Sequence, residues 1–336
     1  MILVTGATGL VGTHLLVKLI KEENKVRALY RTETKKEEAR KVFEFYFSNT
    51  EKHLFDTISW VKTDISDIPA LTEAFNGITH VYHCAAKISF NPARYKTLRK
   101  TNIEGTANVV NLCLTHKVQK LCYVSSIATL GENPISSQIN EDTEWNPEIP
   151  NSVYAITKYG AEMEVWRGVH EGLDAVIVNP GIIIGPGFFN SGSGVLFKKI
   201  HRGMSFYTTG VSGYVSIHDV TNIMYRLMTS VFRNQRYILV SENLSFKNAF
   251  EMMAQALNKP VPKKKASPFL MLIAYYIQRV GSVILNTKQS IFRSSIRTAF
   301  LKRYYENDKI KKELSYSFEP IEKSINETAN FFLDQV

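Results

Sequence analysis

Short apolar runs alternate with longer stretches of helical periodicity through the first two thirds of the chain. Runs of four to six apolar residues between turn signals predict buried strands. They lie at Ile2–Thr5, Lys25–Tyr30, Ile58–Lys62, His80–Cys84, Lys120–Ser125 and Ala175–Asn179. Helices are predicted at about Gly12–Lys21, Lys35–Phe47, Ile68–Ala74, Ile103–Thr115 and Val153–Gly172. This alternation is typical of βαβ units, so the predicted fold class is α/β with a doubly wound parallel sheet.

After Pro180 the alternation gives way to Gly-rich and aromatic segments, 185–194 and 203–213. Such segments are typical of loops, and they predict a smaller, discontinuous C-terminal lobe. One more strand at about Arg236–Val240 and a helix at Phe246–Leu257 follow. We therefore expect a sheet domain at 1–180, to which a segment at about 214–242 returns, and a mainly substrate-binding lobe at 181–336.

A glycine-rich turn joins the first predicted strand to the first helix. It reads Thr5-Gly6-Ala7-Thr8-Gly9-Leu10-Val11-Gly12. Glycine allows a tight turn, close approach of backbone amides to a pyrophosphate, and close packing of helix on strand. The helix N-terminus adds positive potential. In this context the turn predicts a dinucleotide site on a Rossmann-type sheet.

The second strand ends in Arg31, where a dinucleotide site usually places an acid for the ribose hydroxyls. A guanidinium suits a 2′-phosphate, so NADP is favoured and NAD is the alternative. Glu33 lies close enough in the sequence to compete for the ribose. Asp64, after the third strand, is either an acceptor for the adenine amino group or a turn residue.

Two further patterns carry chemistry. Tyr154 and Lys158 share one face of a predicted helix at i and i+4. A Lys beside a phenol stabilises the phenolate, so we expect Lys158 to lower the pKa of Tyr154 for acid/base work. Ser126 lies about 28 residues before Tyr154 and directly follows a buried strand. It is therefore at the carboxyl edge of the sheet, where open α/β proteins bind ligands. Local turn bonds are the alternative explanation for this serine.

The Gly turn, Ser126, Tyr154 and Lys158 together resemble the extended short-chain dehydrogenase/reductase family over nearly the whole chain. The resemblance implies that Tyr154 is the acid/base, that Lys158 binds the nicotinamide ribose, and that Ser126 positions the reacting oxygen. It also implies a homodimer paired through the two helices that carry Ile103–Thr115 and Tyr154–Lys158. The implied cofactor contacts are Gly6, Thr8, Gly9, Leu10, Val11, Gly12, Arg31, Asp64, Ile65, Ala85, Ala86, Lys87, Tyr154, Lys158, Pro180, Gly181 and Ile183.

Arg31, Ser-Ser-Ile-Ala around Ser126 and Lys87-Ile88-Ser89-Phe90 look most like the dihydroflavonol reductase and 3β-hydroxysteroid dehydrogenase branch. This likeness implies NADP-dependent interconversion of a carbonyl and an alcohol on a small or apolar substrate. Aromatic residues in the smaller lobe, among them Phe188, Phe197, Phe206 and Tyr214, suit such a ligand. A nucleotide-sugar epimerase or dehydratase with tightly bound NAD is one alternative. A non-catalytic NADP-sensing regulator is another.

Charge is concentrated in one basic segment. The net charge is +10, yet residues 259–312 contain 13 Lys or Arg and two acids, so the other 282 residues sum to −1. Within it Leu270, Ile273, Ile277, Val280 and Ile284 repeat at helical spacing beside cations such as Lys288. This pattern favours either peripheral membrane contact through 263–297 or an ordinary helix over a substrate pocket. It has no nucleic-acid-binding signature, so no specific nucleic acid partner is expected.

Three cysteines, Cys84, Cys113 and Cys122, form no CxxC pair and have no His at ligand spacing. They predict no metal site and a reducing environment. The start of the chain has no basic region before an apolar core, and Phe269–Leu285 is too short and interrupted to span a bilayer. We therefore expect a cytoplasmic protein, which the basic segment could also bring into peripheral contact with a membrane.

Overall fold

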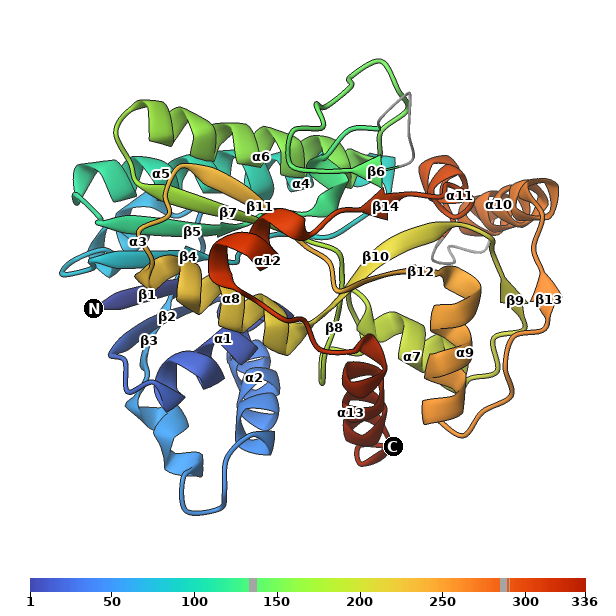
Figure 1. Ribbon diagram of the computed structural model, residues 1–336, viewed down its shortest axis with the longest axis horizontal. Helices are drawn as coiled ribbons and strands as arrows, with labels where there is room; N and C mark the ends of the chain where they lie inside the picture. The colour runs from blue at the N-terminus through green and yellow to red at the C-terminus, as the bar shows by residue number, and fades with distance from the viewer. Residues whose placement is uncertain (133–137, 285–288, 290) are drawn as a thin grey trace.

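The computed structural model describes residues 1–132, 138–284, 289 and 291–336. Its centre is a seven-stranded sheet in the order β11-β7-β5-β4-β1-β2-β3 (Figure 1). Each neighbouring pair is parallel. The strands are β1 (Ile2–Thr5), β2 (Val26–Tyr30), β3 (Ser59–Lys62), β4 (His80–His83), β5 (Lys120–Val124), β7 (Ala175–Pro180) and β11 (Gln235–Leu239). The predicted α/β class with a doubly wound parallel sheet is confirmed.

Helices cover both faces of this sheet (Figure 1). Because neighbouring residues of a strand point to opposite faces, Val4 joins one apolar core and Leu3 joins the other. The first core contains residues of α1 (Leu10–Lys21), α2 (Glu33–Phe45), α8 (Ile217–Thr229) and α12 (Asp308–Leu314). The second contains residues of α3 (Ile68–Ala74), α5 (Gly105–Thr115) and α6 (Val153–His170). Burial on both faces explains why the strand sequences are almost continuously apolar.

A smaller lobe is built on a three-stranded sheet in the order β12-β10-β8. Phe197, Tyr214, Phe250 and Phe332 are buried in its core. Its strands are β8 (Ile182–Ile184), β10 (Val211–Ser216) and β12 (Glu242–Ser245), and its helices are α7 (Gly194–His201), α9 (Phe246–Ala256) and α13 (Ile321–Leu333). Two of the aromatic residues expected to suit a ligand, Phe197 and Tyr214, therefore serve as core.

Short elements complete the described part of the chain. Two-stranded pairs join β6 (Gln138–Ile139) to β14 (Tyr304–Tyr305) and β9 (Phe206–Tyr207) to β13 (Lys264–Lys265). The other α-helices of the described chain are α4 (Tyr95–Leu98), α10 (Pro268–Ile284) and α11 (Arg293–Thr298). Among the helices described, none is long and apolar enough to cross a membrane.

The chain returns to the large sheet over a narrower range than the 214–242 predicted. Helix α8 and strand β11 pack on it, but β10 pairs with β8 and β12 in the small sheet. Helix α12 also returns, since Ile310 and Leu314 are buried in the first core. The division at residue 180 stays a prediction.

Candidate active site

The glycine turn after β1 has the geometry of an anion-binding loop. Gly6 has a φ of +65°, and a Cβ there would lie 2.6 Å from the Cα of Ala85. A Cβ on Gly12 would lie 2.2 Å from the Gly6 carbonyl oxygen, so only glycine allows α1 to pack this close. A Cβ on Gly9 would have only the Gly6 oxygen nearby, at 3.4 Å. Thr8, Leu10 and Val11 are partly exposed beside it.

Helix α1 differs from its neighbours at its N-terminus. Its N-cap is Gly9, which offers no side-chain hydrogen bond, and its first turn contains no acid. By contrast Thr32, Ser152 and Ser216 cap α2, α6 and α8 with their side chains. The first amides of a helix need acceptors, and a pyrophosphate supplies them. The residues present at this turn therefore fit a nicotinamide dinucleotide.

A directional hydrogen-bond chain joins β1 to the loop after β4. The Ala85 amide donates to Thr5 Oγ1 at 3.3 Å, and Thr5 Oγ1 lies 2.6 Å from His83 Nδ1. His83 Nε2 lies 2.9 Å from Thr106 Oγ1, whose hydroxyl donates to the Asn102 carbonyl. These donors assign the proton of His83 to Nε2. Burial lowers the pKa of His83 to about 3, so the ring is neutral.

Asn102 holds the loop that contains Ala85, Ala86 and Lys87. Its Oδ1 accepts from the Lys87 amide at 2.7 Å, and its Nδ2 donates to the Lys87 carbonyl at 3.1 Å. The same Nδ2 donates to Thr157 on α6, at 3.1 Å. Asn102 lies in a π-helical turn, Arg99–Glu104, a distortion frequent at functional sites. The loop is therefore fastened to the helix that carries Tyr154.

Ser126 and Tyr154 meet at the carboxyl end of the sheet. Ser126 follows β5, and its Oγ accepts from the Ala128 amide at 3.2 Å. Burial raises the pKa of Tyr154, and the nearby Ser126 hydroxyl opposes that shift. Ser126 thus makes a local turn bond and also lies close enough to act on the tyrosine.

Lys158 is buried one turn beyond Tyr154, and strand β5 holds its amine. Its Nζ donates to the Tyr123 hydroxyl at 2.7 Å and to the Val124 carbonyl at 2.8 Å. Burial lowers the pKa of Lys158 to about 7, and the Glu162 carboxylate partly opposes this. The expected lowering of the Tyr154 pKa is not found, because desolvation outweighs the remaining interactions of the phenol.

Glu162 lies one turn beyond Lys158 on the same face of α6, and it binds residues that follow β5. The carboxylate is fully buried and accepts from Ser125, Thr129 and Asn179, at 2.5, 2.8 and 2.9 Å. Arg236 on β11 donates to its other oxygen at 3.2 Å. A buried charge needs such partners, so removing one would leave the others unsatisfied. Asn179 also donates to the Ser126 carbonyl at 3.2 Å.

Arg31 and Asp64 lie together at the carboxyl ends of β2 and β3. An Arg31 guanidinium nitrogen lies 3.6 Å from an Asp64 carboxylate oxygen, and both side chains are exposed. Asp64 also accepts from the Ser66 amide and hydroxyl, at 2.9 and 2.8 Å. Partial burial opposes ionisation, but the Ser66 bonds and Arg31 lower the pKa of Asp64. Glu33 accepts from the Tyr30 hydroxyl at 2.7 Å.

Four further assigned residues lie just after Asp64 or at and beyond the end of β7. The Ile65 side chain is buried against Gly105 and its carbonyl accepts from Asn108, and its contact with the cofactor stays a prediction. Pro180 ends β7, and Gly181 has no room for a Cβ, which would lie 2.4 Å from the Gly213 carbonyl oxygen. Ile183 lies in β8 beside Val215, so the pair joins the large sheet to the smaller lobe.

Sequence reasoning missed Tyr123, Glu162 and Arg236. Glu162 had a signal, since it lies at i+4 from Lys158 on a helix face that must be buried. Tyr123 and Arg236 lie on strands, and their partners are distant in the sequence, at 35 and 74 residues. Periodicity does not report such partners.

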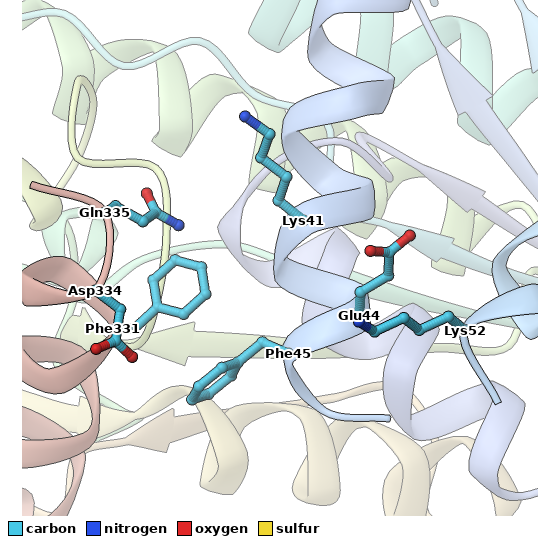
Figure 2. A pocket seen from close by; sticks show the side chains of 7 residues that line it. All are labelled: Lys41, Glu44, Phe45, Lys52, Phe331, Asp334 and Gln335. Atoms are coloured by element: carbon cyan, nitrogen blue, oxygen red, sulfur yellow. The ribbon is translucent and has the colours of Figure 1, made fainter. Parts of the chain in front are cut away.

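A groove far from these residues carries no comparable chemistry. It lies between α2 and the C-terminal end of the chain, lined by residues that Figure 2 labels, among them Lys41, Phe45 and Phe331. The Phe45 and Phe331 rings meet edge to face at 4.8 Å. Helices α2 and α6 cover opposite faces of the sheet, so this groove is separate from the Tyr154 site. No group of three potential metal-ligating residues occurs in the described part of the chain.

The fold, and a glycine turn that fits a nicotinamide dinucleotide, are those of an NAD(P)-dependent enzyme. The chain belongs to the NAD dependent epimerase/dehydratase family, whose model matches residues 2–239. With reductases among its relatives, it is an NAD(P)-dependent oxidoreductase of the extended short-chain dehydrogenase/reductase type. The resemblance seen in the sequence is therefore confirmed.

Three comparisons describe its relatives. A putative dihydroflavonol 4-reductase of Synechocystis sp. is 25% identical over 336 residues, 98% of this chain and 93% of that protein. Sterol demethylase protein B of Methylococcus capsulatus is 26% identical over 273 residues, 80% of this chain and 78% of that protein. UDP-glucose 4-epimerase of Thermus thermophilus, solved with NAD, has a TM-score of 0.75 at 19% identity, covering 100% of this chain and 99% of that one.

Proposed function

We propose that the protein is an NADP-dependent oxidoreductase that interconverts a carbonyl and an alcohol on a small or apolar substrate. The observation that carries this proposal is that Ser126, held by the Ala128 amide, and Tyr154 come together at the carboxyl end of β5, where the serine acts on the pKa of the phenol. Two hydroxyls there provide a proton and a second donor for one substrate oxygen. The catalytic residues are Ser126, Tyr154 and Lys158.

Tyr154 acts as the general acid in the direction of reduction. Its raised pKa keeps the phenol protonated at neutral pH, so it has a proton to give to the carbonyl oxygen. Ser126 Oγ accepts from the Ala128 amide, which leaves its own proton for donation to that same oxygen. A dinucleotide held at the glycine turn would supply the hydride for the carbonyl carbon in reduction and take it back in oxidation. In the oxidation direction Tyr154 takes the alcohol proton.

Lys158 provides a positive charge next to strand β5, near the end where Ser126 lies. Tyr123 and Val124 hold its ammonium, so its position is set before any ligand binds. We propose that the ammonium binds the nicotinamide ribose and favours negative charge on the reacting oxygen. The residues that would hold the dinucleotide are those of the Gly6–Gly12 turn, Ala85 to Lys87, and the backbone at Pro180 and Gly181.

Arg31 supports a preference for NADP. Its guanidinium is 64% exposed at the end of β2, and the Asp64 partner at 3.6 Å is too long for a strong hydrogen bond. A 2′-phosphate would offer bidentate acceptors in its place. Glu33, the competing acid, already accepts from Tyr30. NAD remains the alternative cofactor, as in the epimerase structure compared above.

The loop after β4 supports an apolar substrate. Phe90 lies edge to face with Tyr154, with ring centroids 5.6 Å apart. Phe90 and Ile88 are both large, apolar and exposed, so they present an apolar surface next to the acid. The names of the two relatives above, a dihydroflavonol reductase and a sterol demethylase protein, also point to apolar ring systems.

The test is a titration of the purified protein with NADPH and NADH, followed by a screen of ketones, aldehydes and sterols with the preferred cofactor. We expect tighter binding of NADPH and its oxidation by at least one apolar carbonyl compound. NAD(H) that resists dialysis, together with activity on UDP-sugars, would instead indicate a sugar epimerase. Binding of NADPH without turnover of any carbonyl compound would favour the alternative of a non-catalytic NADP-sensing regulator.

A further inference from the structure

Helix α10 presents an apolar face to solvent. Seven of its large apolar side chains are exposed, from 37% at Leu272 to 72% at Phe269. The others are Leu270, Ile273, Tyr276, Ile277 and Val280. The stripe noted in the sequence thus points outward, which contradicts the reading of α10 as an ordinary cover of a pocket. The side chains of Ile284 and Lys288 lie outside the described residues.

The exposed residues form one continuous face. At about 100° per residue, they fall within an arc of about 160° that contains no polar side chain other than the Tyr276 hydroxyl. Tyr275, on the opposite side, is buried. An exposed surface helix normally shows polar residues to water. This face therefore needs an apolar partner.

Cations border this face. Arg279 lies at its edge and donates to Tyr275 at 3.2 Å, and Arg293 donates to the Tyr276 hydroxyl at 2.8 Å. Lys263 to Lys265, just before the helix, are all exposed. No Asp or Glu occurs between Glu251 and Glu306. The partner must therefore be apolar in its interior and negatively charged at its boundary.

We propose that α10 docks the protein on an anionic lipid bilayer, lying in the interface with its apolar face in the acyl region. Apolar residues flanked by Lys and Arg are the pattern of such helices. A helix of 17 residues is about 25 Å long, which suits a position in the plane of the membrane. A second copy of the chain fits less well, because it would oppose two basic segments.

The docking surface is joined to the active site. Helix α11 follows α10, and Figure 1 shows the two side by side. Arg297 of α11 donates to both carboxylate oxygens of Glu132 at 3.1 Å and to the Pro150 carbonyl at 3.3 Å. Pro150 lies just before α6, which begins at Val153 and carries Tyr154. Docking would therefore hold this end of the site near the bilayer, whatever the substrate.

The experiment is flotation of the full chain with vesicles of phosphatidylcholine, with and without phosphatidylglycerol. We expect binding to the anionic vesicles that weakens at high salt. The Phe269→Ser/Ile277→Ser double variant should bind at least about tenfold more weakly, because it removes two large apolar side chains from the interface. Lys264→Gln should lose about fivefold, the effect of one charge near an anionic surface.

Val231→Ser is the matched control, since Val231 is apolar and 89% exposed but lies outside the basic segment. It should bind like the wild type, and circular dichroism should show all variants folded. The proposal fails if the wild type does not float with anionic vesicles, or if the double variant floats as well as the control. If the wild type does not bind vesicles and light scattering shows an oligomer that the double variant no longer forms, the face is an interface between copies of the chain and the proposal fails.

Discussion

Lys158 donates a hydrogen bond of 2.7 Å to the hydroxyl of Tyr123, which lies 35 residues away on strand β5. Its Nζ also lies 4.5 Å from the centroid of the Tyr123 ring, so the tyrosine gives it both a hydroxyl acceptor and a π face. The ammonium is thus held by the sheet as well as by its own helix. This relationship leads to the first prediction.

Removal of the Tyr123 hydroxyl should shift the pH dependence of reduction. Burial lowers the pKa of Lys158 to about 7, so its ammonium is lost as the pH rises through that value. Tyr123→Phe deletes one acceptor of the charged form and should lower this pKa further. We expect the fall in kcat at rising pH to begin at lower pH in the variant. An unchanged pH profile would show that the Tyr123 contact does not tune Lys158.

Tyr154→Phe should reduce kcat by about 10²–10⁴-fold, the usual contribution of a general acid. The Kd for NADPH should change by no more than a few fold, because one hydroxyl is removed and the ring stays. Tyr159→Phe is the control on the same helix, where the Tyr159 ring stacks on Trp145 at 4.6 Å. Steady-state kinetics and a binding titration measure both. Equal loss in the two variants would argue against a specific role for Tyr154.

Arg31→Glu should weaken NADPH binding far more than NADH binding. A charge-assisted hydrogen bond contributes about 1.5–3 kcal/mol, which corresponds to about tenfold to a hundredfold in Kd. Arg233→Glu is the matched control, since Arg233 is exposed and ion-paired with Asp174 just before β11, at the opposite edge of the sheet. Titration by fluorescence quenching measures both constants. Similar losses for NADPH and NADH would mean that Arg31 does not contact the 2′-phosphate.

Acid should destabilise the fold through two buried histidines. Burial lowers the pKa of His83 to about 3 and that of His14 to about 4, from an ordinary value of 6.5. The unfolded chain therefore binds more protons below pH 6.5, so stability present above that pH is lost as the pH falls. Each histidine should cost about 2 kcal/mol between pH 7 and pH 5.

Urea unfolding at pH 7 and pH 5 tests this loss. His83→Gln should remove about 2 kcal/mol of the pH dependence, while His53→Gln, at an exposed position, should leave it unchanged. His218 works in the opposite direction, since its pKa is raised by Glu327 despite burial. An identical pH dependence in wild type and His83→Gln would show that His83 is not responsible.

The predicted homodimer is testable on α6. Ile156 and Met163 are both exposed, and two helical turns separate them, so they share a face. Met163→Glu would place a charge in an interface formed by α5 and α6 and should yield monomers by light scattering. Val231→Glu, at an exposed apolar site elsewhere, should leave the mass unchanged. If light scattering shows that the wild type is already a monomer, the prediction of a homodimer is wrong.

The sequence was sufficient for the sheet strands and the turn at Gly6–Gly12, because both depend on local pattern. A strand buried on both faces must be apolar along its length. A turn that needs positive φ and close packing needs glycine. The i, i+4 spacing of Tyr154 and Lys158 likewise required only the helix itself.

Only the tertiary structure decided which residues pack against each helix and strand face. Lys158 could have faced the phenol, yet β5 supplies Tyr123 and Val124 as its acceptors. Ile65 turned into the core against Gly105, and the stripe on α10 turned toward solvent. Periodicity records which residues share a face, since that depends on neighbours three or four positions away. The partner of that face comes from segments distant in the chain, and only their packing determines it.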